Sequence, residues 1–281
     1  MDGTGMKQNG IDRNGNRRVA GRVFAFIGGK GGIGKSSIAV NTAIALARRG
    51  LRVILLDAAR FAHVDIMLDA KLPRDLPIGW DDGGPIEQTL TRGPDGLCVA
   101  RHAGRKLPPA DQRPRAEDCE RSVDRLREAS DVAVIDCGSG ISDRAVSLAL
   151  LSDGVVLATT PDPTALTDAY ATAKVLVKRG FKGTVGLVVN MVRSRREAKR
   201  MSRRFQRAAA EFLGLSIQQL GTIPFDRHVV AAARERRPVL VGYPRCAAST
   251  CIIKISRQLP LGEIASAKEA GLWMHAASLF L

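Results

Sequence analysis

The sequence is poor in acidic residues and in aromatic residues for a chain of 281 residues. Asp and Glu number 28 against 43 Lys and Arg, which gives a formal charge of +15, and aromatic residues make up 4%. A charge of this size favours a polyanionic partner, either nucleic acid or an anionic membrane surface. Hydrophobic residues still make up 45% of the chain, so a sizeable core can form and wholesale disorder is excluded.

Long apolar runs and closely spaced cysteines are also missing. No apolar run approaches the roughly 18 residues that span a bilayer, and residues 1–22 lack the apolar core of a signal peptide. We therefore expect a cytoplasmic protein. The five cysteines are spread out without a C-x-x-C pair, which indicates neither a disulfide framework nor a zinc site. We interpret them as reduced thiols, mostly buried.

Apolar strand patterns alternate with helical patterns along most of the chain. Strands are predicted at 22–29, 51–57, 97–100, 131–138, 154–160, 184–190 and 219–223. Helices are predicted near 35–50, 164–178, 195–213, 227–236 and 246–259. This alternation predicts an α/β fold with a doubly wound, mostly parallel sheet and helices on both faces. We expect a single domain at 22–260, a flexible arm at 1–21 and an apolar tail at 261–281.

A glycine-rich segment joins the first predicted strand to the first predicted helix. Residues 29–36 satisfy G-x-x-x-x-G-K-[ST], the pattern of a loop that binds nucleoside triphosphates. In such a loop backbone N–H groups surround the phosphates, Lys35 reaches the β- and γ-phosphates, and Ser36 ligates Mg²⁺. The predicted nucleotide-binding residues of the loop are Gly29, Lys30, Gly31, Gly32, Ile33, Gly34, Lys35, Ser36 and Ser37.

The same glycines also fit a dinucleotide-binding turn. Gly29, Gly31 and Gly34 match G-x-G-x-x-G, and Asp57 ends the next strand about where a ribose-binding acid would stand. A dinucleotide turn has no use for Lys35 and Ser36 directed at a terminal phosphate, which favours the triphosphate interpretation. A glycine-rich turn without a ligand is the remaining alternative.

Several segments, in order, resemble one family. KGGIGKSS at 30–37 resembles the deviant Walker A loop of the MinD/ParA family of dimerising ATPases. Residues 55–68 are similar to the switch I segment of that family, and residues 134–143 resemble its Walker B and switch II segments. Residues 159–176 and 187–200 resemble a branch of MinD-like proteins that controls flagellar number and placement, and 221–240 continue the likeness. It covers about residues 20–260.

This resemblance implies a function and a set of site residues. It implies ATP and Mg²⁺ as cofactors, with a homodimer that forms with ATP and in which Lys30 reaches the partner's nucleotide. The implied catalytic residues are Lys30, Lys35, Asp57 and Asp136. Ser36, Asp57 and Asp136 are the implied metal site, with Asp136 acting through water. Asn190 would contact adenine, and Pro224 and Asp226 would border the base. Asn190 could instead be a strand-end residue that caps a turn.

The likeness also implies where the protein acts and with what. It implies a flagellar or cell-division regulatory protein as partner, and peripheral binding at the inner face of the cell membrane.

Switch I departs from the family pattern. The family has D-x-D, whose second acid orients the attacking water, whereas this chain has Asp57-Ala58-Ala59. A methyl group at Ala59 cannot accept a hydrogen bond from water, so ATP hydrolysis is in doubt. Asp65 lies farther on but is not at the catalytic place. A nucleotide-binding regulatory subunit that does not hydrolyse ATP is therefore an open alternative.

The predicted helix at 195–213 has a basic side. Arg196, Lys199, Arg200, Arg203, Arg204 and Arg207 fall on one side of it, and Met201, Phe205, Ala208 and Phe212 on the other. A solvated outer face is one interpretation. Binding to lipid headgroups or to DNA phosphates is the other, and without interleaved aromatics DNA binding would not depend on sequence. A ParA-like DNA-partitioning ATPase is therefore a second functional hypothesis.

The tail at 261–281 is apolar, but its large side chains project all round a helix. Lys268 is its only basic residue. Membrane docking, packing on the protein or a partner, and disorder all stay open.

Overall fold

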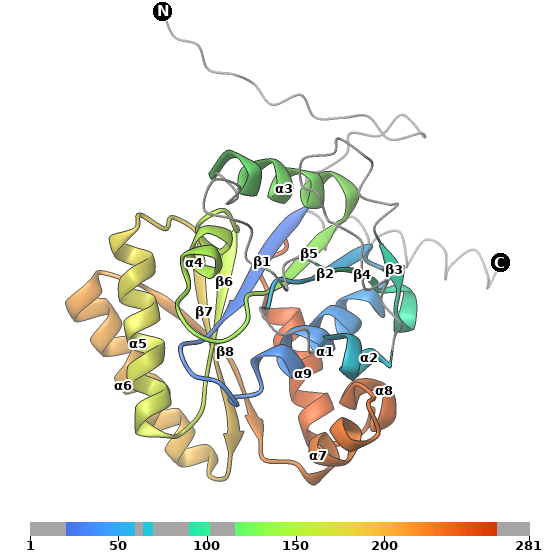
Figure 1. The fold of residues 1–281 in the computed structure, drawn as a ribbon. Helices are drawn as coiled ribbons and strands as arrows, with labels where there is room; N and C mark the ends of the chain where they lie inside the picture. The colour runs from blue at the N-terminus through green and yellow to red at the C-terminus, as the bar shows by residue number, and fades with distance from the viewer. Residues whose placement is uncertain (1–20, 60–63, 70–89, 102–115, 263–281) are drawn as a thin grey trace, which may run out of the picture.

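The structure is a computed structural model that describes residues 21–59, 64–69, 90–101 and 116–262 (Figure 1). The strands are β1 (Arg22–Ile27), β2 (Val53–Asp57), β3 (Thr91–Arg92), β4 (Cys98–Arg101), β5 (Val132–Asp136), β6 (Gly154–Thr159), β7 (Thr184–Val192) and β8 (Ile217–Pro224). The helices are α1 (Lys35–Ala47), α2 (Val64–Leu68), α3 (Ala116–Ala129), α4 (Asp143–Leu150), α5 (Pro163–Lys178), α6 (Arg195–Leu213), α7 (Arg227–Arg234), α8 (Val239–Gly242), α9 (Ala247–Gln258) and the 3₁₀ turn η2 (Pro94–Gly96).

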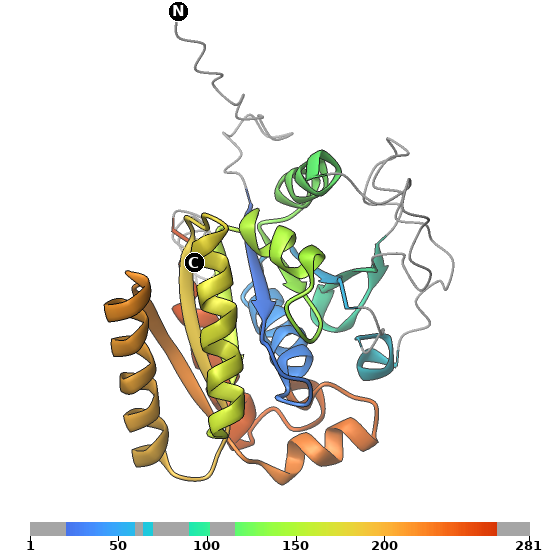
Figure 2. The ribbon, with the colours of Figure 1, turned by 60° about the vertical axis from the view of Figure 1, so that its left-hand side comes forward.

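All of these strands join one sheet in the order β3-β4-β2-β5-β1-β6-β7-β8. β3 is antiparallel to β4, and every other neighbouring pair is parallel. Helices α1, α7, α8 and α9 pack on one face, and α3 to α6 pack on the other (Figures 1 and 2). The predicted doubly wound, mostly parallel α/β fold is confirmed.

The central strands read as continuous apolar runs because helices cover both of their faces. In β1, Phe24 and Phe26 belong to the core beneath α1, whereas Val23, Ala25 and Ile27 belong to the core beneath α3 and α4. β2, β5 and β6 are buried at every residue. This two-sided burial fixes the position of the sheet's centre, where β1 lies between β5 and β6.

The carboxyl ends of the parallel strands meet at the lower edge of the molecule in Figure 1. The loop from β1 to α1 and the beginnings of α5 and α7 lie there. Ligands of open parallel sheets bind at this edge, where neighbouring connections leave toward opposite faces. The fold therefore places the predicted site at the edge where a ligand is expected.

Two elements of the α3–α6 layer lie where no helix was predicted. α3 has few apolar residues among many charged ones, and Val123 and Leu126 are its buried anchors. Ser142 is the N-cap of α4, and its side chain accepts a hydrogen bond from the Ala145 N–H. α3 has too few apolar residues to show a helical period, and α4 is only 8 residues long, which is too short to show one.

The expected burial of the cysteines is only partly correct. Cys137 is buried, but Cys98, Cys246 and Cys251 are half-buried. None of the helices in the described part of the chain is suited to crossing a bilayer. The expected arm at 1–21, apart from Gly21, and nearly all of the tail at 261–281 lie outside the described residues, so the domain boundaries stay predictions.

Candidate nucleotide-binding site

Three glycines of the predicted phosphate loop, Gly29, Gly32 and Gly34, occupy positions where a side chain would be strained or crowded. Gly32 and Gly34 have φ angles of 78° and 81°, in the left-handed region, and Gly34 is the N-cap of α1. A Cβ on Gly34 would lie 2.4 Å from Asn190 Nδ2, and one on Gly29 would lie 2.6 Å from Asp168 Cβ. A Cβ on Gly31 would lie 3.9 Å from Ser139 Cβ, an ordinary contact distance. The loop backbone therefore passes close to side chains of β7 and α5.

Asn190 holds the loop from beneath. Its Nδ2 donates a hydrogen bond to the Ile33 carbonyl at 2.8 Å, and both residues are buried. Asn190 lies inside β7 and not at its end. The described contact is thus a support for the phosphate loop, and a contact with adenine stays a prediction.

Lys35 and Asp136 form a buried ion pair at the centre of the site. Lys35 Nζ lies 2.6 Å from Asp136 Oδ1, and the two side chains are 5% and 0% exposed. Asp136 Oδ1 also accepts a hydrogen bond from the Gly138 N–H, while its Oδ2 has no partner within the described chain. A buried carboxylate oxygen without a partner suits a metal-bound water, so Asp136 fits the predicted Mg²⁺ site.

Asp57 reaches the same place from the neighbouring strand. The register of β2 and β5 pairs Asp57 with Asp136. Asp57 is buried, and its carboxylate accepts hydrogen bonds from the Ala59 N–H at 3.1 Å and from the Val64 N–H at 3.4 Å. These bonds bring the beginning of switch I onto the predicted metal site, although no carboxylate stands at Ala59.

Cys137 follows Asp136 and is enclosed. Burial, together with the neighbouring Asp136 carboxylate, raises the pKa of its thiol to about 12. The thiol is therefore protonated at neutral pH and inert as a nucleophile.

Lys30 is bound at the start of α5 and is partly exposed, unlike Lys35. Its Nζ donates to Asp162 Oδ2 at 3.1 Å and to Thr164 Oγ1 at 2.6 Å. Asp162 is also the N-cap of α5. Hydrogen bonds from the Thr164 side chain, then from Lys30, lower the pKa of Asp162 to about 2, although the carboxylate is exposed. The contact between Lys30 and Asp162 could not be predicted from the loop motif, because the two residues are 132 positions apart in the sequence.

The remaining predicted residues are less closely gathered. Ser36 and Ser37 begin α1, and the Ser37 carbonyl accepts a hydrogen bond from Asn41. Pro224 ends β8 and Asp226 caps α7, where it accepts hydrogen bonds from the backbone of His228 and Ala248. Described contacts thus join Lys35, Asp136, Asp57, Ile33 and Asn190, whereas no described contact joins Pro224 or Asp226 to the loop.

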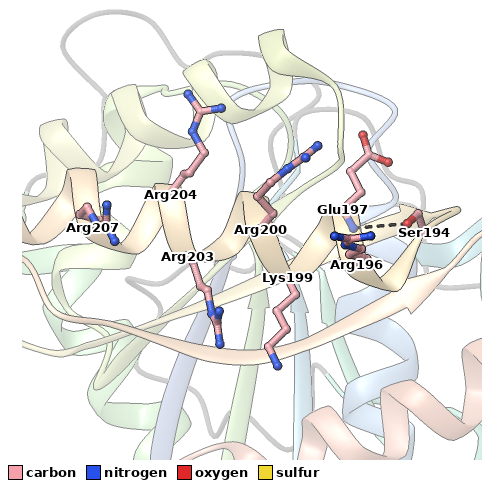
Figure 3. Close-up of a pocket in the computed structure, with 8 residues that line it drawn as sticks. All are labelled: Ser194, Arg196, Glu197, Lys199, Arg200, Arg203, Arg204 and Arg207. Atoms are coloured by element: carbon pink, nitrogen blue, oxygen red, sulfur yellow. Dashed lines mark hydrogen bonds between the residues drawn. The ribbon is translucent and has the colours of Figure 1, made fainter.

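Helix α6 presents the predicted basic face to solvent. All six cations of that face are exposed, and no ion pair joins them to an acidic residue in the described part of the chain (Figure 3). Figure 3 shows Arg200 and Arg204 projecting to one side of the helix and Lys199 and Arg203 to the other. We call Arg196, Lys199, Arg200, Arg203, Arg204 and Arg207 the α6 basic face.

The predicted buried side of α6 needs a correction. Phe205 is buried, but Phe212 is 71% exposed, and Met201 and Ala208 are half-buried. The buried stripe is Ala198, Ser202, Phe205 and Ala209. Phe212 lies in the last turn before Gly214, at the edge of this stripe, whereas the next residue, Leu213, packs on the core.

Comparisons with known proteins agree with this geometry. The family model described as "CobQ/CobB/MinD/ParA nucleotide binding domain" matches residues 24–239. The chain is 30% identical over 240 residues to the antiactivator FleN of Pseudomonas aeruginosa, covering 85% of this chain and 86% of that protein. It is 30% identical over 232 residues to the flagellum site-determining protein YlxH of Helicobacter pylori, covering 81% and 76%.

A solved structure matches the fold at lower identity. The septum site-determining protein MinD of Pyrococcus horikoshii, in complex with Mg-ADP, aligns with a TM-score of 0.70 at 21% identity. The alignment covers 88% of this chain and 98% of that one. At this level of identity the likeness concerns the fold.

Proposed function

This chain belongs to the CobQ/CobB/MinD/ParA family of nucleotide-binding domains, and we propose that it is an ATP-dependent dimerising switch that regulates the number or placement of flagella. The two flagellar relatives support the biological setting, because each covers most of this chain. The proposal includes a cytoplasmic protein that binds peripherally at the inner face of the cell membrane and acts on a flagellar regulatory protein.

The observation that carries the switch is the different exposure of two lysines, Lys30 and Lys35, in the same loop motif. Lys35 is buried against Asp136. Lys30 is 42% exposed. A buried lysine can neutralise the phosphates of a nucleotide bound to its own chain, whereas an exposed lysine is accessible to a second molecule. This arrangement supports a nucleotide that is shared between two copies.

The described residues fit Mg²⁺ and ATP. In this proposal the loop from Gly29 to Ser37 holds the phosphates, Ser36 and Asp57 hold the metal, and Asp136 holds it through water. Bound Mg²⁺ supplies charge that neutralises the phosphate oxygens. Lys35 would exchange its bond to Asp136 Oδ1 for bonds to phosphate, and the Asp136 carboxylate would then be open to a metal-bound water. Asn190, Pro224 and Asp226 are proposed to border the base.

Two measurements test the nucleotide and the biology separately. Calorimetric titration with ATP, ADP and GTP in Mg²⁺ should give binding of the adenine nucleotides and weak or no binding of GTP. Cells without this gene should change in flagellar number or position, and the wild-type gene should restore them. Preference for GTP would contradict the predicted base site, and unchanged flagella would contradict the biological role.

The α6 basic face favours a second function, a DNA-partitioning ATPase. The face runs from Arg196 to Arg207, about 16 Å along the helix, which spans several phosphates of a DNA backbone. Only Glu197 interrupts this stretch with a negative charge. Retention on DNA, but not on anionic vesicles, would favour this function over binding at the membrane.

A further inference from the structure

Three side chains of the kinds that bind transition metals meet where α7 and α9 begin. Asp226 is the N-cap of α7, His228 lies in the first turn of α7, and Cys246 is the N-cap of α9. One ligand atom from each lies within 4.8 Å of the other two. The sequence did not reveal this cluster, because its residues follow no known metal-binding spacing.

We propose that Asp226, His228 and Cys246 form a binding site for a zinc-like transition-metal ion. Carboxylate, imidazole and thiolate are the three protein ligands that Zn²⁺ takes most often. The site is separate from the predicted Mg²⁺ site at Asp136 but shares Asp226 with the proposed base site, so it is tested without nucleotide and does not rest on the nucleotide switch.

The distances suit a tetrahedral ion after small movements. Bonds from Zn²⁺ of about 2.0–2.3 Å place tetrahedral ligand atoms roughly 3.3–3.8 Å apart. Asp226 Oδ1 and His228 Nδ1 are 2.8 Å apart, and the largest separation in the cluster is 4.8 Å at most. Each side chain therefore has to move by only about an ångström. The ion would take the place of the present contact between Asp226 Oδ1 and His228 Nδ1.

The charges balance when the ion is bound. The Asp226 carboxylate accepts hydrogen bonds from the backbone N–H groups of His228 and Ala248, which stabilise its charged form. Binding would release the thiol proton of Cys246 to solvent, so that one carboxylate, one thiolate and a neutral imidazole together leave a divalent complex uncharged. An uncharged complex limits the repulsion that the amino ends of two helices exert on a cation.

Neighbouring groups would orient the ligands. The Ser249 N–H donates to Cys246 Sγ at 3.4 Å, and the ring of His228 lies 5.0 Å from that of Tyr243, measured between centroids. Partners of this kind fix the direction of metal ligands. The His228 side chain is 39% exposed, so an ion can enter and a water can complete the coordination.

Helix capping alone does not account for these residue types. Ser, Thr, Asp and Asn are the preferred N-caps, and a cap at Asp226 needs no imidazole beside it. At Cys246 a serine would accept the same backbone hydrogen bond. This makes Cys246→Ser a matched test, since it keeps a cap and removes the sulfur ligand.

The test titrates Co²⁺ into the full chain without a tag and without nucleotide. Sulfur-to-cobalt charge transfer in the near ultraviolet reports thiolate ligation, and the Mg²⁺ site, which has no sulfur ligand, does not contribute. We expect one Co²⁺ per chain, with this band displaced by Zn²⁺. Cys246→Ser should abolish the band, and His228→Gln should weaken Zn²⁺ affinity by at least about tenfold.

Cys251→Ser is the control, because Cys251 also lies in α9 but outside the cluster. It should leave the band and the affinity unchanged. Absence of the band at saturating Co²⁺, survival of the band in Cys246→Ser, or its loss in Cys251→Ser would each overturn the assignment.

Discussion

Lys35 Nζ lies 2.6 Å from Asp136 Oδ1, inside the protein and 101 positions apart in the chain. The pair joins the loop after β1 to the end of β5, so the residue expected to bind phosphate also stabilises the fold. Breaking a buried ion pair by removing one partner leaves the other charge uncompensated, which costs about 3–5 kcal/mol.

Lys35→Ala is therefore expected to lose both nucleotide affinity and stability. ATP binding should fall severely, because the phosphates lose their inward cation. The free energy of unfolding, from urea titration, should fall by about 3–5 kcal/mol. Lys35→Ala combined with Asp136→Asn should recover part of the stability but none of the binding. Wild-type affinity and stability in Lys35→Ala would contradict the assignment of this loop.

The contact between Lys30 and Asp162 leads to a prediction about how readily the protein forms a dimer. Asp162→Asn keeps an N-cap for α5 but removes the charge that holds Lys30. If Lys30 acts on a partner copy, releasing it should lower the protein concentration needed for dimerisation in ATP. The change should be only a few-fold, because exposed ion pairs contribute little. Analytical ultracentrifugation measures it, and an unchanged or weaker dimer would show that Asp162 does not restrain Lys30.

The α6 basic face should bind polyanions in a salt-dependent way. Affinity should fall with salt, with a slope of roughly 0.9 per phosphate neutralised in the logarithmic plot. Changing Arg200, Arg203 and Arg204 to Glu should flatten that slope in a DNA-retention assay and in vesicle sedimentation.

The matched control changes Arg234, Arg236 and Arg237 to Glu, which alters the net charge equally on the other face of the sheet. These arginines are exposed, in the last turn of α7 or just after it. Equal losses in both triple variants would mean that net charge, and not the α6 basic face, determines binding.

Because Ala59 stands where the family has an acid, we expect the protein to bind ATP but to hydrolyse it slowly. Losing a group that positions or activates water costs on the order of 10²–10⁴ in rate. The loop, Lys35 and Asp136 remain, so ATP binding should persist while phosphate release is slow. Ala59→Asp should accelerate phosphate release, and Ala59→Asn, of the same size but unable to accept a proton, should not. Family-typical turnover in the natural chain with no effect of Ala59→Asp would refute our alignment of switch I.

The central fold could be predicted from the sequence because strands that are buried on both faces are unbroken runs of apolar residues. β1, β2, β5 and β6 are of this kind. α3 could not be predicted, because its helix is specified by charged residues with Val123 and Leu126 as anchors. Phe212 was assigned to the buried side because it lies at the edge of the buried stripe, where helical spacing alone does not separate buried from exposed residues.

At the candidate site, a local sequence motif predicted the phosphate loop but not the residues that contact it. Gly29 to Ser37 are consecutive, so one pattern identifies them. Lys30 with Asp162, and Asn190 with Ile33, are contacts over more than 130 positions, and only the packing of β6, β7 and α5 brings them together. The cluster at Asp226, His228 and Cys246 likewise depends on two helices starting at one place.

The mass of the protein in solution tests the central claim most directly. Light scattering after gel filtration should give the chain mass of 30.1 kDa in Mg-ADP and twice that mass in Mg-ATP. Lys30→Ala should bind ATP yet stay at the single mass in both. A natural chain that binds Mg-ATP but keeps the single mass at every protein concentration would contradict the proposed dimerising switch.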